Sequence, residues 1–443
     1  MNLILRSSNL YWRLFVLCGA LSCGVAAPAQ NVSRYDKQRG QMMLDQVKTD
    51  IESHYYDPKF HGIDLDATFK AASEKIKNAQ SNGQIMGIIA QAALDLEDSH
   101  TAVLPPGRQA ITDYGWEMKV IGDDVYVSRV KDKSDAKVKG LKVGDLVHQV
   151  ASYQPVRANM WKLVYLYYAL RPQPGMQMLV SSPGGEQREV DVLAKVTTRP
   201  PIDLSNEADV LRLVLQNEVD DRERRKSHRT QELGDLVIWK MPEFNLSPDE
   251  VDAMMDKVRT HKAFILDLRD NPGGNEETLL RLIGDLFDKD VKVGVIQRRK
   301  ETRSLVAKSR GDKAFKGQLI VLVDAASASS AEILARVVQL EKRGAVIGDR
   351  TEGAVMRARV YPHEVGVSKA AFFAVSVTDA NVLMGDGKSL ENVGVTPDEI
   401  KLPTGADLAS TRDPVLAYAA KAAGVTIDPD KAGALFPKPK EKQ

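Results

Sequence analysis

Residues Gly317–Met356 read GQLIVLVDAASASSAEILARVVQLEKRGAVIGDRTEGAVM. The run Leu319–Val323 is wholly apolar and rich in β-branched residues, which predicts a strand buried on both faces. Small residues follow over Asp324–Ser330, and apolar residues then recur at helical spacing from Ile333 to Leu340. The chain therefore passes from a buried strand through a tight turn into a helix.

Ser329 lies at this junction and is a candidate nucleophile. The start of a helix offers unpaired backbone N–H groups and a positive dipole end, and both stabilise an anion. The N–H of Ser330 is accordingly a candidate oxyanion donor. The same residues also fit the S-x-x-E capping box, in which Ser329 and Glu332 only satisfy the first helical amides. Both interpretations are open at this point.

A second buried strand, Ala263–Leu268, ends in the turn Arg-Asp-Asn-Pro-Gly-Gly that closes at Gly274. Strands and helices alternate from Leu236 onward, which predicts a crossover sheet with sites beyond the carboxyl ends of its strands. This turn is then expected on the same edge as Ser329. An N–H of Gly273 or Gly274 could complete an oxyanion hole, although a tight turn alone also needs glycine.

The segment from Asp36 to His100 carries three apolar stripes at helical spacing and predicts a small helical domain over 30–108. Its end reads Asp98-Ser-His-Thr101. His100 is the candidate general base, unless it is structural, as a lone histidine usually is. No pair of histidines has metal-ligand spacing, so we predict neither a metal site nor a cofactor.

The first 29 residues have the order of a signal peptide: a basic start, an apolar stretch, and an Ala-Pro-Ala cleavage site that ends at Ala29. The protein is therefore expected to be exported, to a periplasm or outside the cell. Both cysteines, Cys18 and Cys23, lie in this segment, which excludes disulfides and thiolate chemistry after cleavage. A lipoprotein signal ending at Cys23 is the alternative. No later segment predicts a membrane span. The net charge of +1 gives no reason to expect nucleic acid as a partner.

Short strands dominate 109–199, where Gly140-Leu-Lys-Val-Gly-Asp145 precedes a strand and a turn. This pattern resembles a PDZ domain, a family that holds a peptide's C-terminal carboxylate on a loop and adds the peptide as an extra strand. By position, Tyr114, Gly115 and Trp116 would form that peptide-binding loop. A degenerate domain that serves only as a spacer is the alternative.

Three separated segments resemble, in order, the tail-specific (C-terminal-processing) serine peptidases and their tricorn-core relatives: Asp98–Thr101, Asp267–Gly274 and Ser327–Glu332. A fourth, Leu390–Asp398, resembles the closing motif of that family. The resemblance implies a multidomain protein. Its parts would be the N-terminal helical domain, the PDZ-like β-rich domain, an α/β core of the crotonase-like ββα type over 200–434, and a disordered tail over 435–443.

The resemblance also assigns roles, with one departure. The processing branch uses a lysine in a Gly-x-x-Thr-x-Gly-Lys motif, but here Ala354 occupies the lysine position. The tricorn-like branch instead uses a serine–histidine pair and a downstream glutamate, which match Ser99, His100 and Glu391. The implied arrangement is a nucleophilic Ser329 with His100 as its base. The alternative is that Glu391 is only a surface carboxylate in a turn.

The sequence thus predicts an exported serine endopeptidase that cleaves peptides or unfolded protein tails through an acyl-enzyme. Two other functions are open. The loss of the lysine suits a catalytically silent protein that binds peptides or other ligands, and the same acyl-enzyme chemistry suits an esterase or a transferase.

Overall fold

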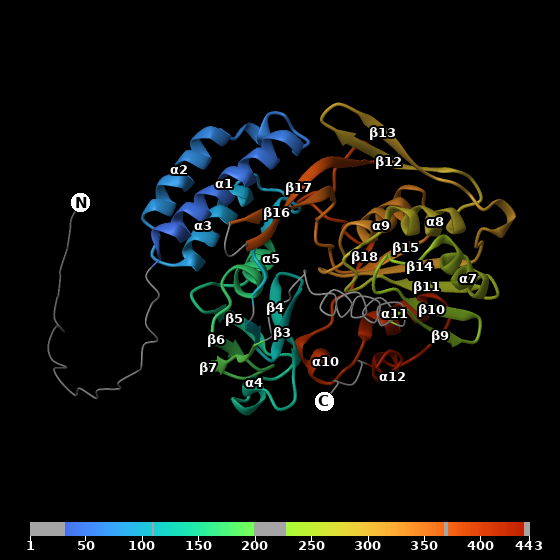
Figure 1. Cartoon of the computed structure of the whole chain (residues 1–443). Helices are drawn as coiled ribbons and strands as arrows, with labels where there is room; N and C mark the ends of the chain where they lie inside the picture. Colours follow the sequence, from blue (N-terminus) through green and yellow to red (C-terminus); the bar gives the residue numbers. More distant parts are fainter. Residues whose placement is uncertain (1–31, 109, 199–226, 367–370, 438–443) are drawn as a thin grey trace, which may run out of the picture.

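The structure is a computed structural model that describes residues 32–108, 110–198, 227–366 and 371–437. The signal peptide predicted for 1–29 and the last six residues of the predicted tail lie outside these ranges. Figure 1 shows three parts: a group of helices near the N-terminus, a β-rich domain, and a larger α/β core. None of the described helices combines the length and the apolar character needed to cross a bilayer.

The N-terminal part consists of α1 (Arg34–His54), α2 (Leu65–Lys77) and α3 (Asn82–Leu94). Each helix begins at a side chain that accepts a hydrogen bond from the first turn, namely Ser33, Asp64 and Ser81. The buried faces of these helices pack on β1 (Ala102–Leu104) and on β17 (Ala371–Met384). The helices therefore share a hydrophobic core with a strand from the far end of the chain.

The β-rich domain is an antiparallel sheet of five strands in the order β3, β4, β5, β6, β7. A short helix follows β4, and a second helical segment separates β5 from β6. A two-stranded ribbon, β2 with β8, leads into and out of the domain. The elements are β2 (Ala110–Asp113), β3 (Trp116–Ile121), β4 (Asp124–Val130), α4 (Asp135–Val138), β5 (Leu146–Val150), α5 (Met160–Val164), η3 (Tyr165–Leu170), β6 (Gly175–Ser181), β7 (Gln187–Leu193) and β8 (Lys195–Thr198).

The α/β core contains a six-stranded sheet in the order β18, β15, β14, β11, β10, β9, in which β9 alone is antiparallel to its neighbour. Helices α7, α8 and α9 pack on one face, and α11 and α12 pack on the other. The central strands are apolar throughout because both of their faces are covered. The bounds are β9 (Arg229–Leu233), β10 (Leu236–Lys240), α7 (Pro248–Val258), β11 (Ala263–Asp267), α8 (Glu276–Leu286), β14 (Gln318–Val323), α9 (Ser330–Leu340), β15 (Ala345–Gly348), β18 (Glu399–Ile400), α10 (Gly405–Ala409), α11 (Pro414–Ala422) and α12 (Pro429–Ala434).

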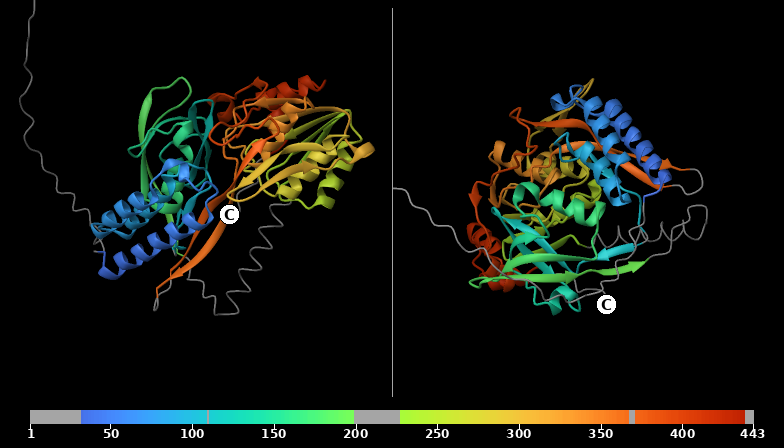
Figure 2. Two further views of the ribbon diagram at one scale, coloured as in Figure 1. Left: turned by 90° about the horizontal axis from the view of Figure 1, so that it is seen from above. Right: turned by 90° about the vertical axis from the view of Figure 1, so that its left-hand side faces the viewer.

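A second sheet connects the core to the N-terminal helices. It contains β12 (Val291–Arg298), β13 (Thr302–Ala307), β16 (Met356–Val365) and β17, and β17 pairs with β1 at one end and with β12 at the other. Figure 2 shows the long strands β16 and β17 running between the helices and the core. The tip of the β12–β13 hairpin also reaches α1, where Arg299 Nε donates to the carbonyl oxygen of Tyr55 at 2.9 Å.

The first three residues of the predicted disordered tail, 435–437, lie within the described part of the chain. Leu435 and Phe436 pack against the core beneath α11 and α12. The guanidinium of Arg229 also lies over the Phe436 ring and donates to the carbonyl oxygen of Pro437. The prediction of disorder from 435 is therefore wrong for 435–437, because the apolar side chains of Leu435 and Phe436 pack against the hydrophobic core.

Candidate active site

The turns that follow β11 and β14 meet at one edge of the six-stranded sheet, as the sequence predicted. The two strands are adjacent and parallel, with Asp267 opposite Leu322. Beyond them, the N–H of Ala328 donates to the carbonyl oxygen of Asn271 at 2.9 Å, and Ser327 Oγ donates to the carbonyl oxygen of Leu268 at 2.8 Å. The two loops are thus joined by hydrogen bonds directly beneath Ser329.

Ser329 has a backbone conformation that an ordinary helix cap does not use. Its φ of 52° and ψ of −117° lie outside the extended region that N-cap residues adopt, although the Ser329 N–H still donates to the Glu332 carboxylate at 3.0 Å, as in a capping box. A non-glycine residue with positive φ is strained, and such strain is common at a nucleophile that projects from a turn between strand and helix. Ser329 therefore combines the capping contact to Glu332 with a backbone conformation that a simple cap does not need.

Glu332 anchors the serine turn from below. Its carboxylate is fully buried and accepts hydrogen bonds from the N–H groups of Ser329, Gly353 and Ala354 at 2.8–3.0 Å, and from the Thr351 hydroxyl. Burial raises the pKa of Glu332 to about 7, while these four donors favour the ionised form. From sequence, Glu332 was expected only as half of a capping box. In the structure it ties the serine turn to the loop 351–354.

Two backbone N–H groups in the turns around Ser329, those of Ser330 and Gly274, make no hydrogen bond among the described residues. Ser330 is the first residue of α9, so its N–H has no partner within the helix. The N–H of Gly273 donates to Asn271 Oδ1 at 2.8 Å. Among the described residues, by contrast, the N–H of Gly274 makes no hydrogen bond. The structure therefore favours Gly274 over Gly273 as the second donor.

Gly273 contributes by having no side chain. A Cβ atom at this position would lie 2.7 Å from Ser329 Cβ and 2.9 Å from the backbone nitrogen of Ser330. Such contacts are too short for real Cβ atoms, so only glycine allows the two turns to approach this closely. Gly273 has a φ of 98°, which also suits glycine.

On the other side of the site, Ser99, His100 and Glu391 form a hydrogen-bonded chain. Ser99 Oγ lies 2.6 Å from His100 Nδ1 and donates to Glu391 Oε2 at 3.0 Å, and the Ser99 N–H donates to Glu391 Oε1 at 2.7 Å. The Ser99 hydroxyl uses its hydrogen atom in the hydrogen bond to the Glu391 carboxylate. Its oxygen therefore accepts the hydrogen bond from His100 Nδ1–H. The other ring nitrogen, Nε2, then carries the free lone pair that a general base needs.

Burial shifts both titratable members of this chain. It lowers the pKa of His100 below its ordinary value, and the negative charge of Asp98 opposes that shift only in part. Burial raises the pKa of Glu391, against the hydrogen bonds that this carboxylate accepts from Ser99 and from the Val355 N–H. A neutral imidazole at neutral pH is the form required of a base.

Asp98 holds the turn that presents His100. Its Oδ1 accepts hydrogen bonds from the N–H groups of His100 and Thr101 and from Thr378 Oγ1, at 2.6–2.9 Å. Thr378 belongs to β17, the strand that links the helices to the core. Within the motif Asp98–Thr101, Asp98 therefore fixes the backbone of the turn and joins it to β17.

The serine and histidine sides meet at the backbone of Ala354 and Val355. The Ser329 N–H donates to the carbonyl oxygen of Ala354 at 3.1 Å, and the Val355 N–H donates to Glu391 Oε2 at 2.8 Å. Among the described residues, no hydrogen bond joins Ser329 Oγ directly to the His100 ring. Ala354, which occupies the lysine position of the processing peptidases, is thus joined to Ser329 by a backbone hydrogen bond. Its methyl side chain cannot act as a base.

The predicted peptide-binding loop lies at the start of β3, with its side chains turned inward. Tyr114 and Trp116 are buried in the core of the β-rich domain. The N–H of Gly115 donates to Asp113 Oδ1 at 2.9 Å. Tyr114 and Trp116 are therefore packing residues, and β3 is an outer strand of its five-stranded sheet.

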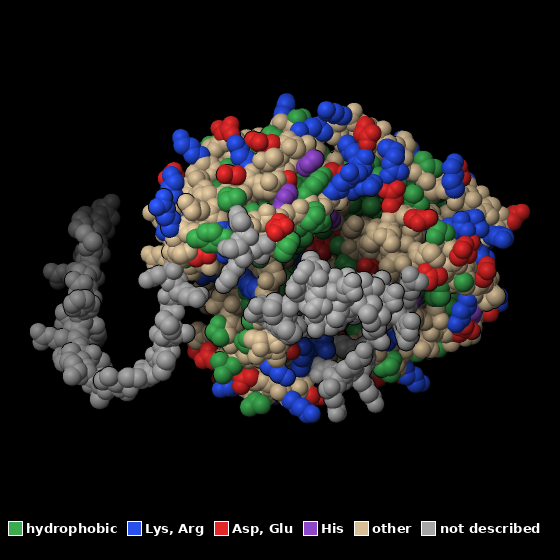
Figure 3. Space-filling model, in the orientation of Figure 1, with side chains coloured by type: hydrophobic (Ala, Val, Ile, Leu, Met, Phe, Trp, Pro, Cys, Tyr) green, Lys and Arg blue, Asp and Glu red, His purple; other side chains and the backbone are tan. Residues whose placement is uncertain are grey.

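A cavity of about 670 Å³ opens beside the start of α8, two residues after Gly274. Arg303 and Arg357 both bind the single carboxylate of Glu276 in its wall. Figure 3 shows lysine and arginine side chains gathered on this side of the molecule. No group of three or more His, Cys, Asp or Glu side chains that could hold a metal ion occurs within the described ranges.

This chain is similar in sequence and fold to known proteases. Residues 235–400 match the sequence model described as Peptidase family S41. A carboxy-terminal-processing protease of Bartonella bacilliformis is 28% identical over 137 residues, which is 31% of this chain and 30% of that protein. A tricorn protease homologue of Streptomyces coelicolor is 24% identical over 394 residues, 84% of this chain and 31% of that protein.

Among solved structures, mature CPAF is similar with a TM-score of 0.63 and 14% identity, over 85% of this chain and 94% of that one. At this identity the likeness is one of fold. The sequence matches confirm the predicted resemblance to tail-specific and tricorn-like serine peptidases and support a serine-type peptidase. The chain spans about 24–36% of the length of the first curated relatives that it matches.

Proposed function

We propose that this chain is an exported serine endopeptidase that cleaves peptides or unfolded protein tails, with Ser329 as nucleophile and His100 as general base. The observation that carries the proposal is the hydrogen-bonded chain of Glu391, Ser99 and His100, tied through Val355 and Ala354 to a serine of positive φ. An ordinary helix cap needs neither the strained backbone nor the oriented imidazole.

The chemistry follows from these groups. Ser329 Oγ attacks the peptide carbonyl carbon while His100 Nε2 takes the hydroxyl proton. The carbonyl oxygen becomes an oxyanion and accepts hydrogen bonds from the N–H groups of Ser330 and Gly274. As the C–N bond breaks, the imidazolium returns its proton to the leaving amine, and an acyl-enzyme remains.

In the second half of the cycle, His100 Nε2 takes a proton from water, and the resulting hydroxide attacks the acyl carbon. The ester bond breaks, Ser329 regains a proton from the imidazolium, and a free carboxyl terminus leaves. In both halves the positive charge on the ring is stabilised by Glu391 through the Ser99 hydroxyl, whose oxygen accepts from Nδ1–H.

The domains outside the core are proposed to handle substrate. Strands β3 to β7 form a five-stranded antiparallel sheet, and for the domain over 109–199 we propose a PDZ-like role with the edge of β3 as the place where an extended peptide pairs. The core, over 200–434, is proposed to be of the crotonase-like type. The cavity beside α8 is large enough for several side chains of an extended polypeptide.

A fluorophosphonate probe tests the assignment of the nucleophile. The protein without residues 1–29 is expected to be labelled, and Ser329→Ala is expected to abolish labelling. Ser304→Ala, on the exposed face of β13, is the matched control and should be labelled like the unchanged protein. Labelling that survives in Ser329→Ala would overturn the assignment. No labelling of the unchanged protein would favour a catalytically silent binding protein.

A panel of substrates separates peptidase from esterase or transferase activity. Hydrolysis of unfolded polypeptides at internal bonds supports the endopeptidase. Turnover of small esters alone, with no cleavage of any polypeptide, would favour the esterase. Recovery of a labelled amine joined to the acyl group would instead indicate a transferase.

A further inference from the structure

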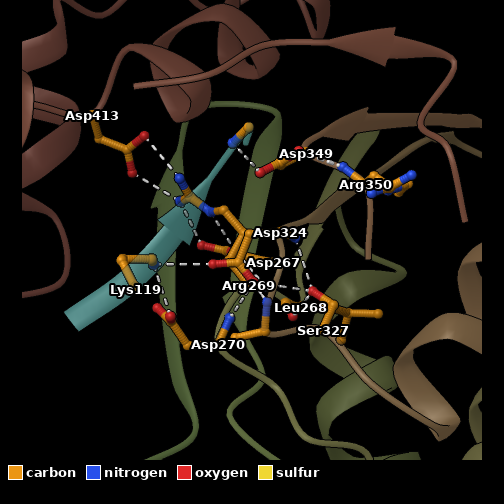
Figure 4. Close-up of polar contacts among 12 residues, drawn as sticks. Lys119, Asp267, Leu268, Arg269, Asp270, Asp324, Ser327, Asp349, Arg350 and Asp413 are labelled. Atoms are coloured by element: carbon orange, nitrogen blue, oxygen red, sulfur yellow. Dashed lines mark hydrogen bonds and ion pairs between the residues drawn. The ribbon is translucent and has the colours of Figure 1, made fainter. Parts of the chain in front are cut away.

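Lys119 reaches out of the β-rich domain into the two turns that build the candidate site. It lies on β3, and its Nζ donates to Asp270 Oδ1 at 2.9 Å and to Asp324 Oδ2 at 3.1 Å. Figure 4 shows the lysine side chain pointing from its strand toward both carboxylates. One ammonium group therefore bridges the turn after β11 and the turn after β14.

The two aspartates belong to the segments that carry the catalytic groups. Asp270 precedes Gly274 by four residues, and Asp324 precedes Ser329 by five. Asp324 Oδ1 also accepts a hydrogen bond from the Asp270 N–H at 2.9 Å, and this contact brings the turns together. The relative position of these turns decides whether the two proposed oxyanion donors point at the same atom.

The negative charges of Asp270 and Asp324 explain why a cation is needed between the two turns. Two carboxylates that share one site repel each other unless a positive charge lies between them. Asp270 is held in a strained conformation with a φ of 60°. Although burial alone would raise the pKa of Asp270, the charge of Lys119 holds it well below its usual range. The lysine thus keeps the Asp270 carboxylate ionised and, through its two hydrogen bonds, holds Asp270 and Asp324 close together.

A second contact reinforces the same junction. Asp349, directly after β15, accepts hydrogen bonds from the Gly122 N–H at 2.8 Å and from Arg157 Nη2 at 2.7 Å. Gly122 and Arg157 belong to the β-rich domain. The turns after three consecutive strands of the core sheet, β11, β14 and β15, are thus all contacted from one neighbouring domain.

We propose that Lys119 is a positioning residue for hydrolysis: its ammonium holds the turns after β11 and β14 in the relative position in which the Gly274 and Ser330 N–H groups face one carbonyl oxygen. The proposal rests on the proposed function above and extends it, because it makes the β-rich domain part of the apparatus that sets catalytic geometry. The Lys119 ammonium itself touches none of the reacting atoms.

The test uses Lys119→Met, which keeps most of the length of the unbranched side chain and removes its charge. With a peptide too short to reach β3, kcat is expected to fall about tenfold to a hundredfold, with KM changed far less, because the bound substrate meets a misplaced oxyanion hole. Lys139→Met, an exposed lysine of the same domain, is the control. The double variant Lys119→Met with Asp270→Asn should regain most of kcat, because it removes the uncompensated negative charge.

Three results would overturn the proposal. The first is a Lys119→Met variant with unchanged kcat, and the second is a double variant that folds but is no faster than Lys119→Met. If Lys119→Met does not unfold cooperatively on heating, Lys119→Arg decides the question. Near-normal kcat in that variant supports a role of the charge, and a folded but slow Lys119→Arg variant is the third result against it.

Hydrogen exchange separates this proposal from the proposed function. The backbone amides over 268–274 and 324–330 should exchange faster in Lys119→Met than in the unchanged protein or in Lys139→Met. A protein that no probe labels, but whose two turns exchange faster in Lys119→Met, would end the peptidase proposal and leave the bridging role intact. Unchanged exchange and unchanged kcat in an active protein would end the bridging role alone.

Discussion

The serine side and the histidine side of the candidate site are built in different ways. Ser329, Ser330 and Glu332 lie within four residues of one another, and the loop they contact follows the neighbouring strand of the same sheet. On the histidine side, Ser99 binds a carboxylate 292 residues away. The first arrangement depends on local backbone geometry and the second on long-range hydrogen bonds, so we expect their variants to fail differently.

The largest effect should come from removing the base. In His100→Ala, Ser329 has no group to accept its proton, and kcat/KM for peptide hydrolysis should fall by about 10³–10⁴-fold. His54→Ala is the control, because His54 is exposed at the end of α1 and stacks on Tyr361. Full activity in His100→Ala would show that the base lies elsewhere. The fold should be retained, since the ring lies at the edge of its core.

The anchor of the serine side should rank second. Glu332→Gln replaces one acceptor oxygen by an NH₂ group that faces N–H donors, so the serine turn loses hydrogen bonds in a buried place. We expect kcat to fall on the order of a hundredfold, together with a loss of about 1–3 kcal/mol in the free energy of unfolding. Urea denaturation and single-turnover kinetics measure the two effects. Glu189→Gln, at an exposed position on β7, should change neither.

Ser99→Ala tests the link between base and carboxylate. The imidazole remains but loses the hydroxyl that accepts from Nδ1–H, a hydrogen bond that should strengthen when the ring is charged. One such bond corresponds to about 1.5–3 kcal/mol, so kcat should fall roughly tenfold to a hundredfold. If Ser99→Ala matched His100→Ala, Ser99 would itself be indispensable for proton transfer. No change at all would favour the surface role for Glu391.

The smallest effect is a shift in pH dependence. His100 acts as a base only when neutral, so activity is present above its pKa and is lost as the pH falls through it. Because burial lowers that pKa, the acid limb of kcat/KM should lie below the ordinary histidine value of about 6.5. A pH–rate profile with a short peptide measures the midpoint. A midpoint at or above 6.5 would contradict the buried environment assigned to the ring.

Much of the serine side could be predicted from the residues themselves. The apolar strands Leu319–Val323 and Ala263–Leu268 and their small-residue turns are local signals, and parallel pairing brings their ends to one edge. The choice between Gly273 and Gly274 could not be predicted, because it depends on which N–H the side chain of Asn271 occupies. The buried acceptor role of Glu332 likewise depends on a loop some 20 residues away.

The histidine side entered the prediction through a resemblance, because no local pattern joins His100 to Glu391. Lys119 had no signal at all, since one lysine on a short strand looks like any other surface cation. The placement of β17 against the N-terminal helices was equally hidden, although it fixes Thr378 beside Asp98. Each of these contacts joins segments far apart in the chain.

By itself, the sequence determined the strand–turn–helix units, the strained serine's place between them, and the family they resemble, because short-range sterics and hydrophobic periodicity act between near neighbours. Only the tertiary structure decided which N–H groups remain free, which carboxylate orients the imidazole, and that a lysine from another domain bridges the two turns. The physical reason is that burial and hydrogen bonding depend on distances in space, which chain position does not specify.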